Sequence, residues 1–272
     1  MEQHHDAYEI LPFPRSREGA IDLLRTAQRK HMIHALIEVD VTVPRQLIRE
    51  HKACTGESLS FTAFIVSCVA KTVDEDKTLH AYRNWRNQIV VFDEVDVNTM
   101  IERRVGDRTM GTPCILRAAN RKTLGQIHQE IRAAQAQPTE AVAGMEWFRW
   151  ASWLALLPGF VRGWMWRAAF RSPRLVKQFA GTVGVTAVGM FGMGGGWGLT
   201  IPLLTLNLVV GGIAQKPGVV EGRIEAHEYL HLTISIDHDI IDGAPAARFA
   251  RRLAELIETG YGLTPVADGC TS

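Results

Sequence analysis

The sequence has little of what marks several common classes of protein. Its 272 residues include only four cysteines, with no C-x-x-C pair and none at metal-ligand spacing from a histidine. The formal net charge is only +1, so no overall field points to nucleic acid or an acidic partner. No secretory n-region and apolar h-region open the chain. We therefore expect a cytoplasmic protein with reduced thiols, no metal site and no nucleic-acid partner.

What the sequence contains is the pattern of one α/β domain over residues 15–262, between short tails at 1–14 and 263–272. Apolar residues make up 46% of the chain and charged residues 22%, which is ordinary for a globular protein with a full core. Helices and strands alternate, which favours a single α/β domain. Helices are expected at 16–31 and 44–55, after 58–61 and through residue 75, at 122–136 and at 244–259. Strands are expected at 35–43, as two short strands within 88–101, at 112–117, within 181–215, and at 225–237.

Residues 238–243 (HDIIDG) stand where an expected strand meets an expected helix. The apolar residues Leu232, Ile234 and Ile236 fix the register of that strand, so His238 at its end is held rigidly and can still face a cavity. A histidine side chain ordinarily titrates near pH 6.5, so its neutral form can act as a general base. Taken alone, a histidine and an aspartate four residues apart can equally well form only a strand–helix turn.

The wider sequence resembles a known family. Residues 235–249 are similar to the C-terminal catalytic signature of the acyltransferase components of 2-oxo acid dehydrogenase complexes, which share their fold with chloramphenicol acetyltransferase. Three further segments agree in the same order along the chain. These are 120–127, the glycine-bounded strand at 181–192, and 211–222. The resemblance covers about residues 15–262.

The resemblance implies a fold, a reaction and an assembly. The fold is a two-layer α/β sandwich with a mixed β-sheet. His238 would be the general base, Thr186 the hydroxyl that donates to the oxyanion, and Asp242 a residue that orders the loop around His238. Without the resemblance, Thr186 reads as a β-branched residue that fills a sheet. The active site would lie between subunits of a homotrimer, and trimers in this family also build larger assemblies.

Several positions depart from the family pattern. Asp239 replaces the arginine that usually follows the histidine, which reverses the charge beside it, and Ala187 replaces an asparagine. No lipoyl domain, subunit-binding domain or Ala/Pro-rich linker precedes residue 15. We therefore expect no covalent lipoyl group and a free acyl-CoA as the donor. The acceptor could be a thiol, an alcohol or an amine.

Residues 137–180 form an insert that is longer than the usual connection in the family. Five of the seven tryptophans lie here, with arginines among them, and the uncharged run 150–161 is too short to span a bilayer. Three interpretations remain open. The insert could pack as a helical hairpin on its own or a neighbouring subunit, it could cover an acyl pocket, or residues 145–170 could make a peripheral membrane contact.

Two further motifs and two alternative functions also follow from the sequence. His31 and His34 could line a channel or be ordinary core or surface histidines, and residues 192–196 (GMGGG) favour a flexible turn over a phosphate loop because no Lys-Ser/Thr follows. A noncatalytic oligomeric scaffold that retains the fold is the main alternative. A condensation-type enzyme is disfavoured, since the chain is short and Asp237 stands before His238 where those enzymes have a second histidine.

Overall fold

The computed structural model describes residues 9–14, 16–105, 108–136, 157–187 and 194–264. Its centre is a six-stranded mixed sheet with the order β1-β8-β7-β6-β4-β5. The strands are β1 (Met32–Asp40), β4 (Val97–Val105), β5 (Arg108–Leu116), β6 (Val183–Ala187), β7 (Leu206–Val220) and β8 (Arg223–Asp237). β6 runs parallel to both β4 and β7, and the other neighbours are antiparallel. The predicted mixed sheet is confirmed.

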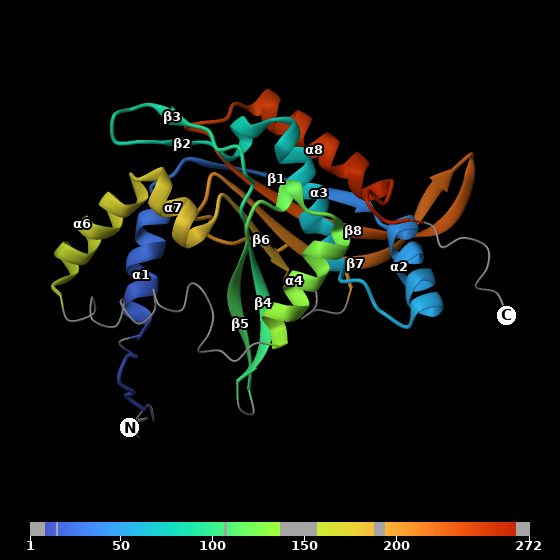
Figure 1. The fold of residues 1–272 in the computed structure, drawn as a ribbon, viewed down its shortest axis with the longest axis horizontal. Coiled ribbons are helices and arrows are strands. Elements are labelled where there is room, and N and C mark those ends of the chain that lie inside the picture. Colours follow the sequence, from blue (N-terminus) through green and yellow to red (C-terminus); the bar gives the residue numbers. More distant parts are fainter. Residues whose placement is uncertain (1–8, 15, 106–107, 137–156, 188–193, 265–272) are drawn as a thin grey trace, which may run out of the picture.

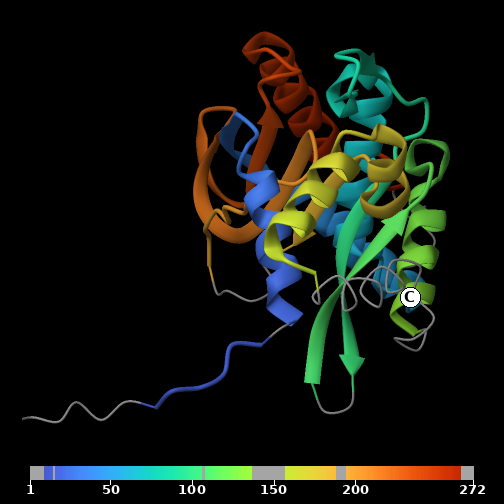
Figure 2. The same ribbon diagram turned by 90° about the vertical axis from the view of Figure 1, so that its left-hand side faces the viewer.

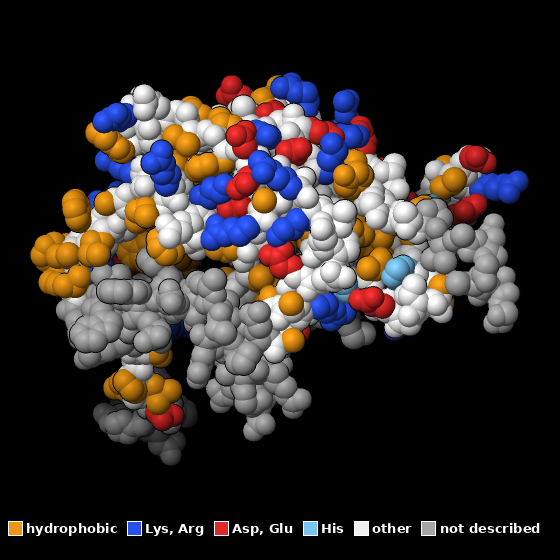
Figure 3. All heavy atoms as spheres, viewed as in Figure 1, with side chains coloured by type: hydrophobic (Ala, Val, Ile, Leu, Met, Phe, Trp, Pro, Cys, Tyr) orange, Lys and Arg blue, Asp and Glu red, His pale blue; other side chains and the backbone are white. Residues whose placement is uncertain are grey.

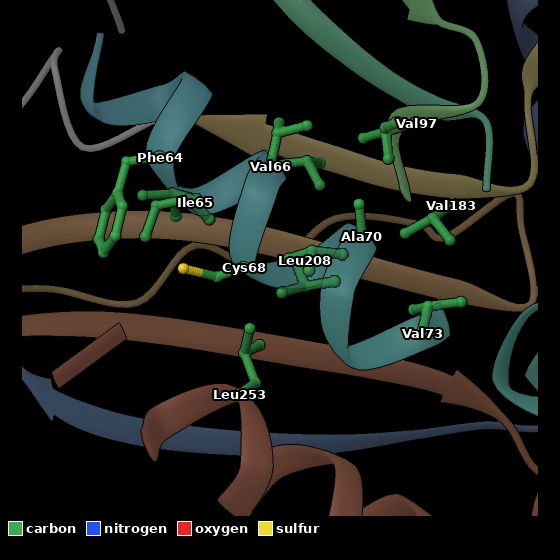
Figure 4. Packing of buried hydrophobic residues seen from close by; sticks show 14 of the residues in the cluster. Phe64, Ile65, Val66, Cys68, Ala70, Val73, Val97, Val183, Leu208 and Leu253 are labelled. Atoms are coloured by element: carbon green, nitrogen blue, oxygen red, sulfur yellow. The ribbon is translucent and has the colours of Figure 1, made fainter. Parts of the chain in front are cut away.

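One face of the sheet is covered by helices that enclose the core. These are α2 (Thr42–Thr55), α3 (Phe61–Glu75), α4 (Leu124–Ala136) and α8 (Gly243–Glu258). The innermost is α3, since its residues are almost continuously apolar or small and are buried along most of its length. Figure 4 shows its side chains packed over the sheet together with Leu253 of α8. Ser60 caps its start by accepting a hydrogen bond from the Ala63 N–H.

The remaining helices gather at the end of the sheet where β4 and β5 lie (Figures 1 and 2). They are α1 (Ser16–Ala27), α6 (Gly159–Phe170) and α7 (Pro173–Ala180). Along β4, Val97 and Thr99 are buried in the core, whereas Asn98 and Met100 point to the opposite face. Because Asn98 and Met100 share a cavity with residues of α1, α6 and α7, these helices cover that opposite face.

The hairpin of β2 (Tyr82–Arg83) and β3 (Ile89–Val90) stands beside the sheet. It is preceded by a short 3-10 helix, η1 (Lys77–His80), which the sequence did not predict. A second short 3-10 helix, η2 (Ala119–Arg121), leads from β5 towards α4. The first helix ends earlier than expected, and β5 starts four residues before the predicted strand because it pairs with β4 along its whole length. Among the described residues, no helix is long and apolar enough to cross a membrane.

Candidate active site

His238 is fixed through its backbone while its side chain is exposed. It directly follows β8, whose Leu232, Ile234 and Ile236 are buried in the core. Full burial of such side chains stabilises a fold by about 1.5–3 kcal/mol each, so the strand end is firmly held. The His238 N–H donates a hydrogen bond of 2.8 Å to the carbonyl of His31, at the start of β1. The residue is exposed in the single chain, so its imidazole is open to a substrate or a neighbouring subunit.

The turn that carries His238 is organised by Asp237. This buried carboxylate lies 2.9 Å from the ammonium of Lys30 and accepts a 3.2 Å hydrogen bond from the Asp239 N–H. Its carbonyl accepts hydrogen bonds from the N–H groups of Ile240 and Ile241. Asp242 is the residue that the sequence predicts to order this loop. In the structure it is the N-cap residue of α8, is exposed, and makes no side-chain capping bond.

Asp239, the residue that reverses charge in the family pattern, is paired with a histidine. Its carboxylate lies 2.8 Å from Nδ1 of His31, and both side chains are exposed. His34, three residues after His31, shares a 2.8 Å hydrogen bond with the buried Ser235 hydroxyl. His31 and His34 therefore line the β1–β8 edge beside His238. The partners are more than 200 residues apart in sequence, which is why the sequence could not reveal the pairs.

Thr186 lies on β6, on the face of the sheet away from the core. Val183 and Val185 are buried in the core, so Gly184 and Thr186 point to the other side. At Gly184 a Cβ would come within 2.6 Å of the Asn207 side-chain oxygen, so glycine is needed for this close approach. The partly buried Thr186 hydroxyl thus lies on a strand fixed on both sides by parallel pairing.

A buried polar network holds the start of β6. Asp96 accepts hydrogen bonds from the Arg117 guanidinium and the Ala118 N–H, and its carbonyl accepts from the Thr182 and Val183 N–H groups. Arg117 also donates to the last carbonyls of α7 at Lys177 and Gln178. Arg117 therefore joins α7 to Asp96, whose backbone carbonyl holds the start of β6.

His80 belongs to the same network. Its Nδ1 lies 2.9 Å from the Thr182 hydroxyl, and Nε2 lies 3.0 Å from the carbonyl of Phe92. Since a carbonyl only accepts, Nε2 carries the proton, and Nδ1 of the neutral ring accepts from Thr182. Burial lowers the pKa of His80 to about 4. His80 is thus a neutral structural histidine that the sequence analysis did not single out.

The structure does not bring Thr186 and His238 together within one chain. Thr186 is paired with Val209, and Val209 with Thr233, so the threonine lies level with a residue five positions before His238 and two strands away. With strands about 4.8 Å apart and about 3.3 Å per residue, the two Cα atoms are about 19 Å apart. A hydroxyl and an imidazole this far apart cannot act on the same carbonyl.

Two cavities of different chemistry share Met100 in their linings. Thr99 pairs with Val185, so the next residues along the two parallel strands, Met100 and Thr186, are neighbours. One cavity, of about 420 Å³, has the arginines Arg45, Arg49 and Arg132 among its lining residues and also Glu102. Arg45 and Arg49 are partnered by Glu228. The other cavity, of about 400 Å³, is apolar.

Among the residues that the structure describes, no three His, Cys, Asp or Glu side chains are grouped so that they could hold an ion. Burial raises the pKa of the Cys68 thiol far above its usual range, so this buried cysteine stays a protonated core residue.

The mixed sheet and the helices on its core face form the chloramphenicol acetyltransferase-like fold, as predicted. Residues 174–263 match the family model of 2-oxoacid dehydrogenases acyltransferase (catalytic domain). The predicted resemblance to that family is therefore confirmed, and the matched segment contains both Thr186 and His238.

Solved structures match nearly the whole chain. A probable dihydrolipoamide acetyltransferase from Listeria monocytogenes superposes with a TM-score of 0.66 at 20% identity, covering 98% of each chain. The cubic core of a pyruvate dehydrogenase multienzyme complex gives 0.66 at 18% identity, over 94% of this chain and 93% of that one. The Azotobacter vinelandii dihydrolipoamide acetyltransferase gives 0.65 at 20% identity, with the same coverage. At these identities the likeness establishes the fold.

Curated relatives match shorter stretches. The dihydrolipoyllysine-residue acetyltransferase component of the pyruvate dehydrogenase complex of Acholeplasma laidlawii is 38% identical over 82 residues, which is 30% of this chain and 15% of that protein. The corresponding protein of Mycoplasma genitalium is 22% identical over 207 residues, 76% of this chain and 45% of that protein. The chain thus spans less than half the length of these relatives.

Proposed function

We propose that the protein is a CoA-dependent acyltransferase in which His238 is the general base and Thr186 the oxyanion donor. The observation that carries the proposal is the exposed His238 on a rigid strand end. The separations of the proposed residues along the sequence support this proposal. In the A. vinelandii enzyme, a serine, a histidine and an asparagine studied for their roles in catalysis are separated by 52 and 4 positions. Thr186, His238 and Asp242 have the same separations.

The reaction follows from these two side chains. The neutral imidazole of His238 takes the proton of a thiol, alcohol or amine acceptor, whose heteroatom attacks the carbonyl carbon of the acyl-CoA thioester. The carbonyl oxygen becomes an oxyanion and accepts a hydrogen bond from the Thr186 hydroxyl. The C–S bond then breaks, and the CoA thiolate receives the proton from the imidazolium. General base catalysis contributes about 10²–10⁴-fold and one oxyanion donor about 10²–10³-fold.

The site requires two subunits. Since Thr186 and His238 are about 19 Å apart in one chain, we propose that neighbouring chains of a homotrimer supply one residue each. The similarity to an enzyme that forms a cubic core supports an oligomer and, by extension, larger assemblies of trimers. The cavity with Arg45, Arg49 and Arg132 provides donors for the phosphates of CoA.

The test is release of free CoA from a panel of acyl-CoA donors with thiol, alcohol and amine acceptors, comparing wild type with His238→Ala. We expect transfer by the wild type and a loss of at least about 10²-fold in the variant. Equal rates for the two proteins would contradict the role of His238. Failure of every donor and acceptor, in a protein that assembles normally, would favour the noncatalytic scaffold.

A further inference from the structure

An apolar cavity lies near Thr186, and many of its lining residues come from α6 and α7, which belong to the insert at 137–180. Its wall comes from Leu23 of α1, Met100 of β4, Trp166 of α6 and Val176 of α7. None of the described residues that line it is charged, and the amide of Asn98 is already used, since it donates to the carbonyl of Ala180. The volume of about 400 Å³ is within the range of small-molecule sites. Such a cavity favours a hydrocarbon group.

The position of the cavity connects it to the proposed chemistry. Met100 in its wall is the next residue after Thr99, which pairs with Val185, so Met100 lies beside Thr186 at about one strand spacing of 4.8 Å. Both side chains point away from the core. A carbonyl that accepts a hydrogen bond from Thr186 therefore lies near Met100 in the wall of this cavity.

The second cavity indicates which part of the substrate enters. An acyl-CoA carries anionic phosphates at one end and its acyl chain at the other. The arginines of the other cavity belong to α2 and α4 on the core face of the sheet and offer hydrogen-bond donors to phosphates, whereas the apolar cavity on the opposite face has no charged residue to bind them. This charge complementarity leaves the apolar cavity for the group attached to the carbonyl carbon.

We infer that this cavity binds the acyl chain of the donor, and that the donor is an acyl-CoA with a linear chain longer than acetyl. The inference rests on the proposed function, because it takes Thr186 as the contact of the thioester carbonyl. It gives α6 and α7 a role in substrate choice.

The test is direct binding of acetyl-, butanoyl-, hexanoyl- and octanoyl-CoA to the full-length His238→Ala protein, which separates binding from turnover. Each added CH₂ buried in the cavity is expected to lower Kd about fourfold, the equivalent of about 0.8 kcal/mol. A Kd that is independent of chain length would overturn the inference. So would a chain-length dependence shown only by free alcohols or thiols and not by acyl-CoA, since that would assign the cavity to the acceptor.

A matched pair of variants locates the effect. Ala169 lines the cavity, and its neighbour Ala168 on the same helix is exposed and does not. Ala169→Phe should remove most of the preference for octanoyl- over acetyl-CoA, and Ala168→Phe should retain it. Equal preferences in the two variants would overturn the inference. If Ala169→Phe does not fold, the chain-length series alone decides.

The two proposals can fail separately. Chain-length-dependent binding without any transfer contradicts the acyltransferase proposal but leaves a fatty-acyl site in place. Transfer of acetyl groups with no preference for longer chains contradicts only the acyl-chain inference.

Discussion

The ammonium of Lys30 lies 2.9 Å from the carboxylate of Asp237, the residue before His238, and their side chains are only 19% and 5% exposed. Lys30 also lies 5.7 Å from the centre of the Tyr82 ring. This pair ties the end of β8 to the segment that leads into β1. Because Asp237 also accepts from the Asp239 N–H, the ion pair determines the shape of the turn that holds His238.

Lys30→Met should therefore lower kcat more than it raises KM. The variant leaves a buried carboxylate without its cation, which should cost about 2–3 kcal/mol of stability, and it releases the turn. A displacement of the base by about 1 Å can cost up to 10²-fold in rate, so we expect kcat to fall at least about tenfold. Steady-state kinetics and urea denaturation measure the two effects.

Lys71→Met is the control for this prediction. Lys71 is paired with Glu75 one helical turn away, at 3.4 Å on the surface, so its removal should cost less than about 0.5 kcal/mol and leave kcat unchanged. If Lys30→Met has the same small effects as Lys71→Met, Asp237 does not position His238.

Subunit mixing should restore activity to two inactive variants. In a trimer assembled at random from equal amounts of Thr186→Val and His238→Ala chains, about a quarter of the sites receive both intact residues if each site takes them from two different chains. Co-expression with two affinity tags and an acyl-transfer assay measures this. If one chain supplied both residues, every site would contain one defect and the mixture would stay inactive.

Stability should fall in mild acid because of His80. Burial lowers the pKa of His80 to about 4, whereas an unfolded histidine titrates near 6.5. Between these values the unfolded chain binds a proton that the folded chain does not, so this contribution is complete above about pH 6.5 and is lost by about 1.4 kcal/mol per unit as pH falls towards 4.

His80→Gln should remove this part of the pH dependence. Urea midpoints at pH 7, 5.5 and 4.5 for the wild type and the variant give the difference, in which the carboxylates common to both proteins cancel. Parallel pH profiles for the two proteins would show that His80 is not the group responsible.

The insert should be anchored by Arg162 of α6. Its guanidinium lies 2.7 Å from Asp22 and 3.0 Å from Glu18, both on α1. Arg162 is 12% exposed and Asp22 5%, so Arg162→Ala leaves a buried carboxylate without its main partner and should cost about 3 kcal/mol. Arg25 is 3.7 Å from the same Asp22 but 75% exposed, and Arg25→Ala should cost less than about 0.5 kcal/mol. Equal thermal stabilities of the two variants would refute the anchoring role.

The peripheral membrane contact predicted for 145–170 stays a prediction. Within the described part of that range, Phe160 and Trp164 of α6 are 78% and 66% exposed, and Figure 3 shows apolar side chains gathered over this helix. Co-sedimentation with anionic liposomes should decrease when both residues are changed to serine, since buried apolar area drives such binding. Equal sedimentation of the variant and the wild type would argue against the contact.

The sequence predicted the parts of the fold that rest on local patterns. The strand before His238 and the helix after it follow from apolar periodicity, and both are present as β8 and α8. The start of β5 does not follow from apolar periodicity. Residues 108–111 have no apolar alternation of their own and become a strand through pairing with β4. The helix η1 depends on the Asp76 side chain, which caps the Thr78 N–H.

His238, Thr186 and Asp242 follow from sequence motifs and their spacing, and their catalytic roles stay predictions. The contacts around them do not follow from the sequence. The partners that shape the turn, Lys30 for Asp237 and His31 for Asp239, lie at the other end of the sequence, next to β1. Only the pairing of β1 with β8 brings them together. The apolar cavity depends on the packing of α1, α6 and α7, which the Trp- and Arg-rich composition of residues 137–180 does not determine.

If Thr186 and His238 act together as proposed, their separation along the ladder makes catalysis a property of the assembly. Under the proposed arrangement an isolated chain is folded and inert, and each complete site appears only when chains meet. Below the dissociation constant of the trimer, the rate would then rise with up to the third power of protein concentration. Expression level, and not only substrate, would decide whether the reaction runs.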